Sequence, residues 1–115
     1  MDRYVPVIVG VGQVTQRPGE DHPREPLELM AEAARRAQHD AGSANILSGL
    51  ESVRVINVMS WPSSDPPGDL ARALGSSPRD LQYTHIGGNT PQWLVNETAD
   101  AIARGERRCA LIAGA

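Results

Sequence analysis

Residues 81–113, LQYTHIGGNTPQWLVNETADAIARGERRCALIA, decide the fold because they contain a strand, a helix and a second strand in that order. Leu81–Ile86 is a short β-rich run. Thr90 is the expected N-cap of a helix whose first position is Pro91, and this helix should end at Gly105. Its inward residues should be Leu94, Val95, Thr98, Ala99 and Ile102. The run CALIA, residues 109–113, predicts a buried strand.

The same alternation extends toward the N-terminus. Pro26 is expected to begin a helix that stops at Gly42. Ser52–Met59 should form a strand, and Asp69–Gly75 a short helix. The first helix has an apolar stripe with helical spacing, made of Leu27, Met30, Ala34, Ala37 and Ala41.

The run YVPVIVGV, Tyr4–Val11, predicts a further strand that is central and covered on both faces. The complete order is then βαβαβαβ, which indicates an α/β fold with a mainly parallel sheet. A chain of 115 residues has room for one domain. Because it stops directly after an apolar strand, we expect residues 1–115 to be the N-terminal domain of a longer chain.

Composition excludes several classes of function. Fourteen acidic and eleven basic residues give a net charge of −3, and the bases are scattered, so no nucleic-acid partner is expected. All eleven bases are Arg, which excludes a phosphate-binding or Schiff-base lysine within these residues. A single cysteine and the lack of a long apolar stretch lead us to expect a cytoplasmic protein without a membrane partner.

The run GVGQ, residues 10–13, follows a predicted strand, as a dinucleotide-binding turn would. However, the third glycine of that pattern falls on Thr15, and a polar loop follows instead of a helix. We therefore expect a close-packed turn, with nucleotide binding as the alternative.

No metal site is expected, because the spacing of His22, His39 and Cys109 fits no zinc pattern. Cys109 should be a buried structural residue. Trp61, in a proline-rich loop, is expected either to line a ligand pocket or to plug the sheet edge.

The stretch THIGGNTPQW, residues 84–93, joins a strand to a helix N-terminus, where unpaired N–H groups favour anions. Gly87 and Gly88 would let a ligand approach closely, and Asn89 offers a short polar group. The geometry would suit an oxyanion or a thioester oxygen. The alternative is that the glycines serve only a sharp turn.

Five segments follow one another along the chain: VPVIVGVGQ, EPLELMAEAARRAQHDAG, ESVRVINVMSWP, GGNTPQWLVNETADAIARGE and CALIAGA. In this order they resemble the N-terminal part of the thiolase superfamily. The resemblance is strongest to the thiolase-like acetyl-CoA acetyltransferase branch related to sterol-carrier-protein thiolases, and it covers almost the whole chain. It implies that the chain is most of the first, incomplete half of a two-half fold.

The resemblance implies acyl transfer on acyl-CoA thioesters and a role in lipid metabolism, with coenzyme A as substrate and no permanently bound cofactor. It also implies a homodimer through residues 81–105. The family's nucleophilic cysteine corresponds to Gly88, which cannot hold an acyl group. His85 is the candidate acid, base or thioester-polarising donor, with a packed structural histidine as its alternative. The chain by itself is therefore expected to be inactive, and a non-catalytic acyl-CoA- or lipid-binding protein is the second possible function.

Overall fold

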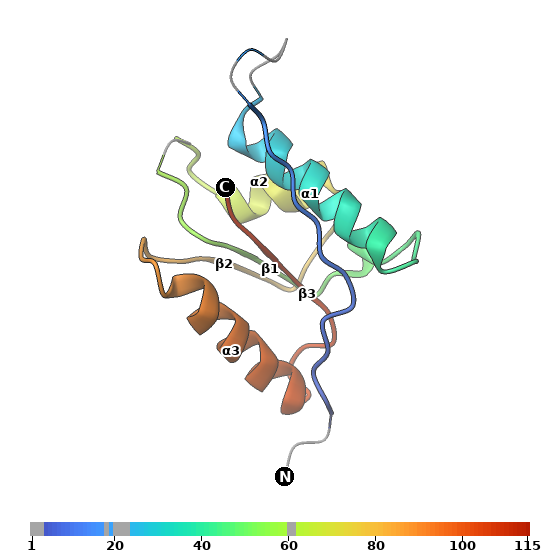
Figure 1. Ribbon diagram of the computed structural model, residues 1–115. Coiled ribbons are helices and arrows are strands. Elements are labelled where there is room, and N and C mark those ends of the chain that lie inside the picture. The colour runs from blue at the N-terminus through green and yellow to red at the C-terminus, as the bar shows by residue number, and fades with distance from the viewer. Residues whose placement is uncertain (1–3, 18, 20–23, 60–61) are drawn as a thin grey trace.

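The computed structural model describes residues 4–17, 19, 24–59 and 62–115. Three short parallel strands form a sheet in the order β2-β1-β3, with α1 and α2 on one face and α3 on the other (Figure 1). This arrangement confirms the predicted α/β fold with a parallel sheet. In chain order the elements are α1 (Pro26–Asp40), the 3-10 helix η1 (Leu47–Gly49), β1 (Ser52–Val55), α2 (Pro66–Ala73), β2 (Asp80–Tyr83), α3 (Thr90–Ala103) and β3 (Ala110–Ala113).

Strand β1 is the centre of the sheet. Ser52 lies in register with Asp80 of β2 and Ala110 of β3. Because side chains alternate along a strand, Val53 points to the opposite face from Ser52. The main apolar cluster is made of Met30, Ala31, Ala34, Leu47, Leu50, Val53, Val55, Val58, Leu70 and Ala71.

Three helices lie where the sequence predicts them, and their ends have local causes. α1 begins at Pro26, and Gly42 follows it with φ +73°. Likewise Gly105 follows α3 with φ +78°. These are left-handed conformations that glycine adopts without strain. α2 begins three residues before the predicted Asp69, because the Asp65 carboxylate accepts a hydrogen bond from the Gly68 N–H at 3.1 Å.

The prediction that Tyr4–Val11 is a buried central strand is wrong for this structure. The segment pairs with no strand among the described residues, and the side chains of Val5 and Ile8 are 83% and 77% exposed. An apolar β-branched run indicates burial, but it does not name the strand that would pair with it. The sheet accordingly has three strands and is centred on β1.

The remaining differences concern element ends and faces. The predicted strands are longer than β1, β2 and β3, and β3 is only half-buried because it lies at a sheet edge. Asn89, not Thr90, is the N-cap of α3, and its side chain caps no N–H. Val95 is 38% exposed, whereas Ala101 and Ala103 are buried together with Leu94 and Thr98.

No helix within the described ranges is long and apolar enough to span a membrane.

Candidate functional site

The candidate site is the turn of residues 84–89, which connects the carboxyl end of β2 to the first residue of α3. In open α/β sheets, ligands bind beyond the carboxyl ends of the strands. Thr84 is buried, and its N–H donates to the Val55 carbonyl at 3.0 Å. The turn therefore starts from a fixed point on the central strand.

The turn brings the four predicted site residues together, and all four are exposed: His85, Gly87, Gly88 and Asn89. The Thr84 hydroxyl donates to the His85 carbonyl at 3.2 Å, and the Thr90 N–H donates to the Gly87 carbonyl at 3.2 Å. These two hydrogen bonds, one from a side chain and one from the backbone, define the turn. The Asn89 side chain does not cap the N-terminus of α3.

Neither glycine of the turn has a positive φ, so the backbone conformation does not demand glycine there. A Cβ atom on Gly87 would lie 3.0 Å from the Thr90 hydroxyl, whereas one on Gly88 would meet no atom of the described residues within 4 Å. The sharp-turn explanation therefore does not account for Gly88. Gly88 is exposed, and the described residues leave the space beside it open.

The loop that follows β1 is tied to the same end of the sheet by Tyr83. The Tyr83 hydroxyl accepts a hydrogen bond from the Val58 N–H at 2.8 Å. Sequence analysis missed this contact, because a tyrosine in a β-rich run does not indicate which distant residue will form a hydrogen bond with its hydroxyl.

Sequence analysis also missed a cluster of charged residues on the sheet face that α3 covers. Arg54 is 5% exposed in the middle of β1, and Asp80 lies beside it on β2. Burial alone would raise the pKa of Asp80. Hydrogen bonds from Arg107 and Ser52 outweigh that effect and hold this pKa below its usual value. The available signal was an arginine inside the β-branched run SVRVINV.

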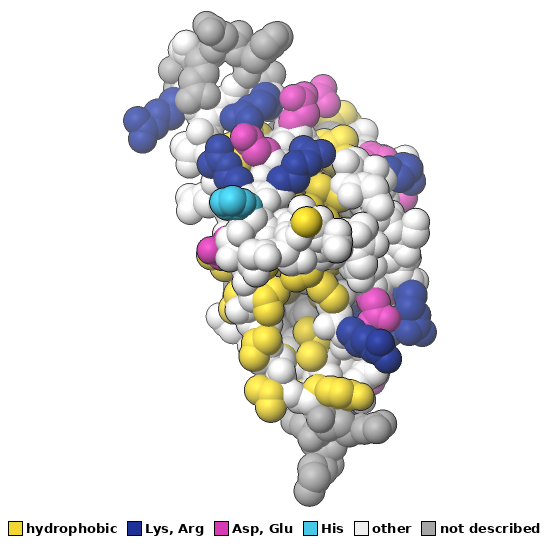
Figure 2. Space-filling model, turned by 90° about the vertical axis from the view of Figure 1, so that its right-hand side faces the viewer, with side chains coloured by type: hydrophobic (Ala, Val, Ile, Leu, Met, Phe, Trp, Pro, Cys, Tyr) yellow, Lys and Arg dark blue, Asp and Glu magenta, His cyan; other side chains and the backbone are white. Residues whose placement is uncertain are grey.

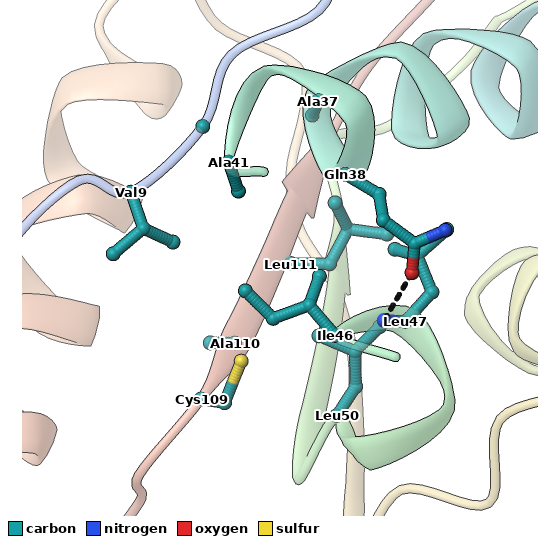
Figure 3. A pocket seen from close by; sticks show the side chains of 11 residues that line it. Val9, Ala37, Gln38, Ala41, Ile46, Leu47, Leu50, Cys109, Ala110 and Leu111 are labelled. Carbon is teal, nitrogen blue, oxygen red and sulfur yellow. Dashed lines mark hydrogen bonds between the residues drawn. The ribbon is translucent and has the colours of Figure 1, made fainter. Parts of the chain in front are cut away.

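Cys109 lies at the opposite, amino-terminal end of the sheet, away from the turn. It lines a small, mostly apolar hollow between the N-terminal segment, α1, η1 and β3 (Figure 3). The Gln38 side-chain oxygen at this hollow accepts a hydrogen bond from the Leu47 N–H at 3.0 Å. Burial, together with the charge of Glu51, raises the pKa of the Cys109 thiol. These features support the predicted structural role, although the residue is only half-buried.

The glycines of GVGQ pack against α1. A Cβ atom on Gly10 would lie 2.2 Å from the Ala37 carbonyl oxygen, and one on Gly12 would lie 2.1 Å from that of Ala33. This close packing accounts for both glycines, as expected from the sequence. Hydrophobic side chains gather on the lower half of the face shown in Figure 2. The large hydrophobic residues that are exposed include Val5, Val7, Ile8 and Val9 of the N-terminal segment.

Within the described part of the chain, no three His, Cys, Asp or Glu side chains form a group that could hold a metal ion. His22 and Trp61 lie outside the described residues, so the expectations for them are untested.

No family model and no curated protein matches the chain. Among solved structures, it matches the crystal structure of a monomeric SCP2-thiolase like protein type 1 from Mycobacterium smegmatis, with a TM-score of 0.83 and 36% sequence identity. The match covers 96% of this chain and 23% of that one, so the chain spans about a quarter of the length of this relative.

The three-stranded α/β layer is thus part of a thiolase-like fold. More particularly, the chain is a relative of the SCP2-thiolase-like proteins, which confirms the resemblance found in its sequence.

Proposed function

We propose that this chain is the N-terminal part of a thiolase-like protein that binds acyl-CoA thioesters at the turn of residues 84–89. The observation that carries the proposal is the open space beside Gly88, at the carboxyl edge of a sheet whose fold is thiolase-like. Backbone N–H groups near the start of α3 would favour the partly negative thioester oxygen.

Acyl transfer of the acetyl-CoA acetyltransferase type is the activity proposed for the whole protein. Gly88 offers no nucleophile, so in this proposal the nucleophile comes from residues outside this chain. His85 is exposed on the turn, which suits an acid, base or thioester-polarising role.

Non-catalytic binding of acyl-CoA or lipid is the second candidate, and Gly88 is the observation that favours it. The two candidates differ in one product. An acyltransferase transfers the acetyl group of acetyl-CoA to its nucleophile, which forms a covalent acetyl-enzyme and releases free CoA, whereas a binding protein forms no such adduct. Rapid acid quench of the full-length protein with radiolabelled acetyl-CoA separates them.

Binding itself is tested by calorimetry of the full-length protein with acetyl-CoA. Gly88→Val fills the open space and should weaken binding about tenfold, or about 1.4 kcal/mol. Gly49→Val is the matched control, because a Cβ atom at Gly49 also meets nothing within 4 Å, and it should bind normally. Equal affinity of both variants would remove the turn from the binding site.

We also propose a homodimer through residues 81–105. Leu81 and Trp93 support it, being 45% and 52% exposed on an edge strand and on α3. Sedimentation velocity of the wild type and of Leu81→Asp tests this. A dimer that the substitution dissociates supports the interface, and a wild-type monomer, as the relative is described, would refute it.

A further inference from the structure

The two faces of the sheet differ in chemistry. The face toward α1 and α2 is apolar, with Val53 and Val55 fully buried. The alternate residues of β1, Ser52 and Arg54, lie on the face that α3 covers, and they are 0% and 5% exposed (Figure 1). A guanidinium thus lies between the central strand and the helix that begins at the candidate site.

Arg54 links three elements. Its Nε donates to the Ser52 hydroxyl at 2.9 Å, and its Nη1 donates to the Thr98 hydroxyl on α3 at 3.0 Å. Two carboxylates flank it, that of Asp80 on β2 at 3.9 Å and that of Glu97 on α3 at 3.7 Å. The Thr98 hydroxyl in turn donates to the Leu94 carbonyl at 2.7 Å. These hydrogen bonds fix the orientation of the Thr98 hydroxyl and of the Arg54 guanidinium.

Stability alone does not explain a buried arginine here. Removing a cation from water is costly, and an apolar residue of similar volume often serves as well or better. The guanidinium makes directional hydrogen bonds, which an apolar side chain cannot make. These bonds fix the position of α3 both along its axis and in rotation about it. The fully buried apolar contact of α3 is Leu94, and the other buried residues of its inner face are small or polar: Thr98, Ala101 and Ala103.

The position of α3 determines the geometry of the turn. One end of the turn is held by the bond from Thr84 to Val55, and the other end is the first residue of α3. Thr98 lies eight residues beyond Thr90, about 12 Å along a helix that moves as one body. A shift at Thr98 therefore moves Gly88 and Asn89 relative to His85.

We infer that Arg54 is a positioning residue for the candidate site: its hydrogen bond to Thr98 sets the place of α3 over the sheet and thereby the shape of the turn of residues 84–89. The functional consequence rests on the proposed binding of acyl-CoA at that turn. Arg54 does not touch the ligand in this inference.

The test uses the full-length protein with Arg54→Met and Thr98→Val, and with Thr98→Ser as the variant that keeps the hydroxyl. Thermal unfolding first establishes that each variant is folded. Affinity for acetyl-CoA is then measured by calorimetry at a temperature where all are folded. We expect about tenfold weaker binding for Arg54→Met and Thr98→Val, and affinity within about twofold of wild type for Thr98→Ser.

A second readout needs no ligand. Amide chemical shifts of His85, Gly88 and Asn89 should move in Arg54→Met and Thr98→Val but stay in place in Thr98→Ser. If the wild type binds no acetyl-CoA, the proposed function fails, and these shifts still decide the role of Arg54. If Arg54→Met does not fold because Glu97 is left unpaired, Thr98→Val gives the answer. Wild-type shifts and affinity in a folded Thr98→Val would overturn the inference.

Discussion

The hydroxyl of Tyr83 meets both polar groups of the Val58 backbone, accepting from its N–H at 2.8 Å and lying 3.4 Å from its carbonyl oxygen, to which it donates. These residues lie 25 positions apart. Tyr83 is the last residue of β2, and Val58 lies in the loop that follows β1. The hydroxyl therefore fastens the loop after β1 to the strand that leads into the candidate site.

Replacing Tyr83 by Phe should release that loop with little other change, since the ring is retained. We expect the free energy of unfolding to fall by about 1–2 kcal/mol, because the variant loses two hydrogen bonds whose usual net value is about 1 kcal/mol each. We also expect the Val58 amide to exchange with solvent much faster, as measured by hydrogen exchange and NMR. Unchanged protection of Val58 in the variant would show that the hydroxyl does not hold the loop.

The packing of Gly10 against α1 gives a prediction with a built-in control. Gly10→Ala would place a Cβ atom 2.2 Å from the Ala37 carbonyl oxygen, so the N-terminal segment must move away from α1. Overpacking of this kind costs about 1–3 kcal/mol. Gly49→Ala meets no neighbour and should be near neutral. Denaturant unfolding measures both, and equal stability would contradict the close approach.

The turn of residues 84–89 and the run GVGQ, residues 10–13, show which features of the fold the sequence predicts and which it does not. The turn of residues 84–89 was located correctly because Pro91 and the apolar spacing of α3 are local signals. The contact of Gly10 with Ala37 is long-range, so the sequence predicts a close-packed turn at GVGQ but not which helix packs against it. Tyr4–Val11 was misplaced for the same reason, since its composition indicates burial but not a partner.

At the candidate site, too, the local features could be predicted from the sequence and the long-range contacts could not. His85, Gly87, Gly88 and Asn89 adjoin one another in the chain, so their meeting on one turn could be predicted. The contacts of Arg54 with Thr98 and of Tyr83 with Val58 join separate elements, and they depend on the register of β1 with β2. The sequence pattern does not contain that register.

The lowered pKa of Asp80 makes folding sensitive to acid. Burial opposes ionisation of this carboxyl, but hydrogen bonds from Arg107 and Ser52 prevail and lower its pKa below the ordinary 3.8. A group with a lower pKa in the folded state contributes stability above its unfolded pKa, and that contribution is lost as the pH falls through its folded pKa. The loss due to Asp80 should therefore occur below pH 3.8.

Acid titration of unfolding in wild type, Asp80→Asn and Arg107→Gln checks this. Asp80→Asn should be less stable than wild type at pH 7, and the difference should shrink as the pH falls below 3.8. Arg107→Gln removes one of the bonds that lower the pKa of Asp80, so its acid transition should begin at higher pH. A pH-independent difference between wild type and Asp80→Asn would contradict the assignment.

Cys109 should react slowly with thiol reagents. Its burial beside β3, with the charge of Glu51 nearby, raises the pKa of the thiol, and the thiolate is the reactive form. At pH 8 we expect iodoacetamide to modify the native protein at least several-fold more slowly than the same protein in denaturant, followed by mass spectrometry of the peptide that contains Cys109. The denatured sample controls for the intrinsic reactivity of the sequence around the thiol. A native rate equal to the denatured rate would mean that Cys109 is freely accessible, and it would reopen the question of whether this thiol has a chemical role.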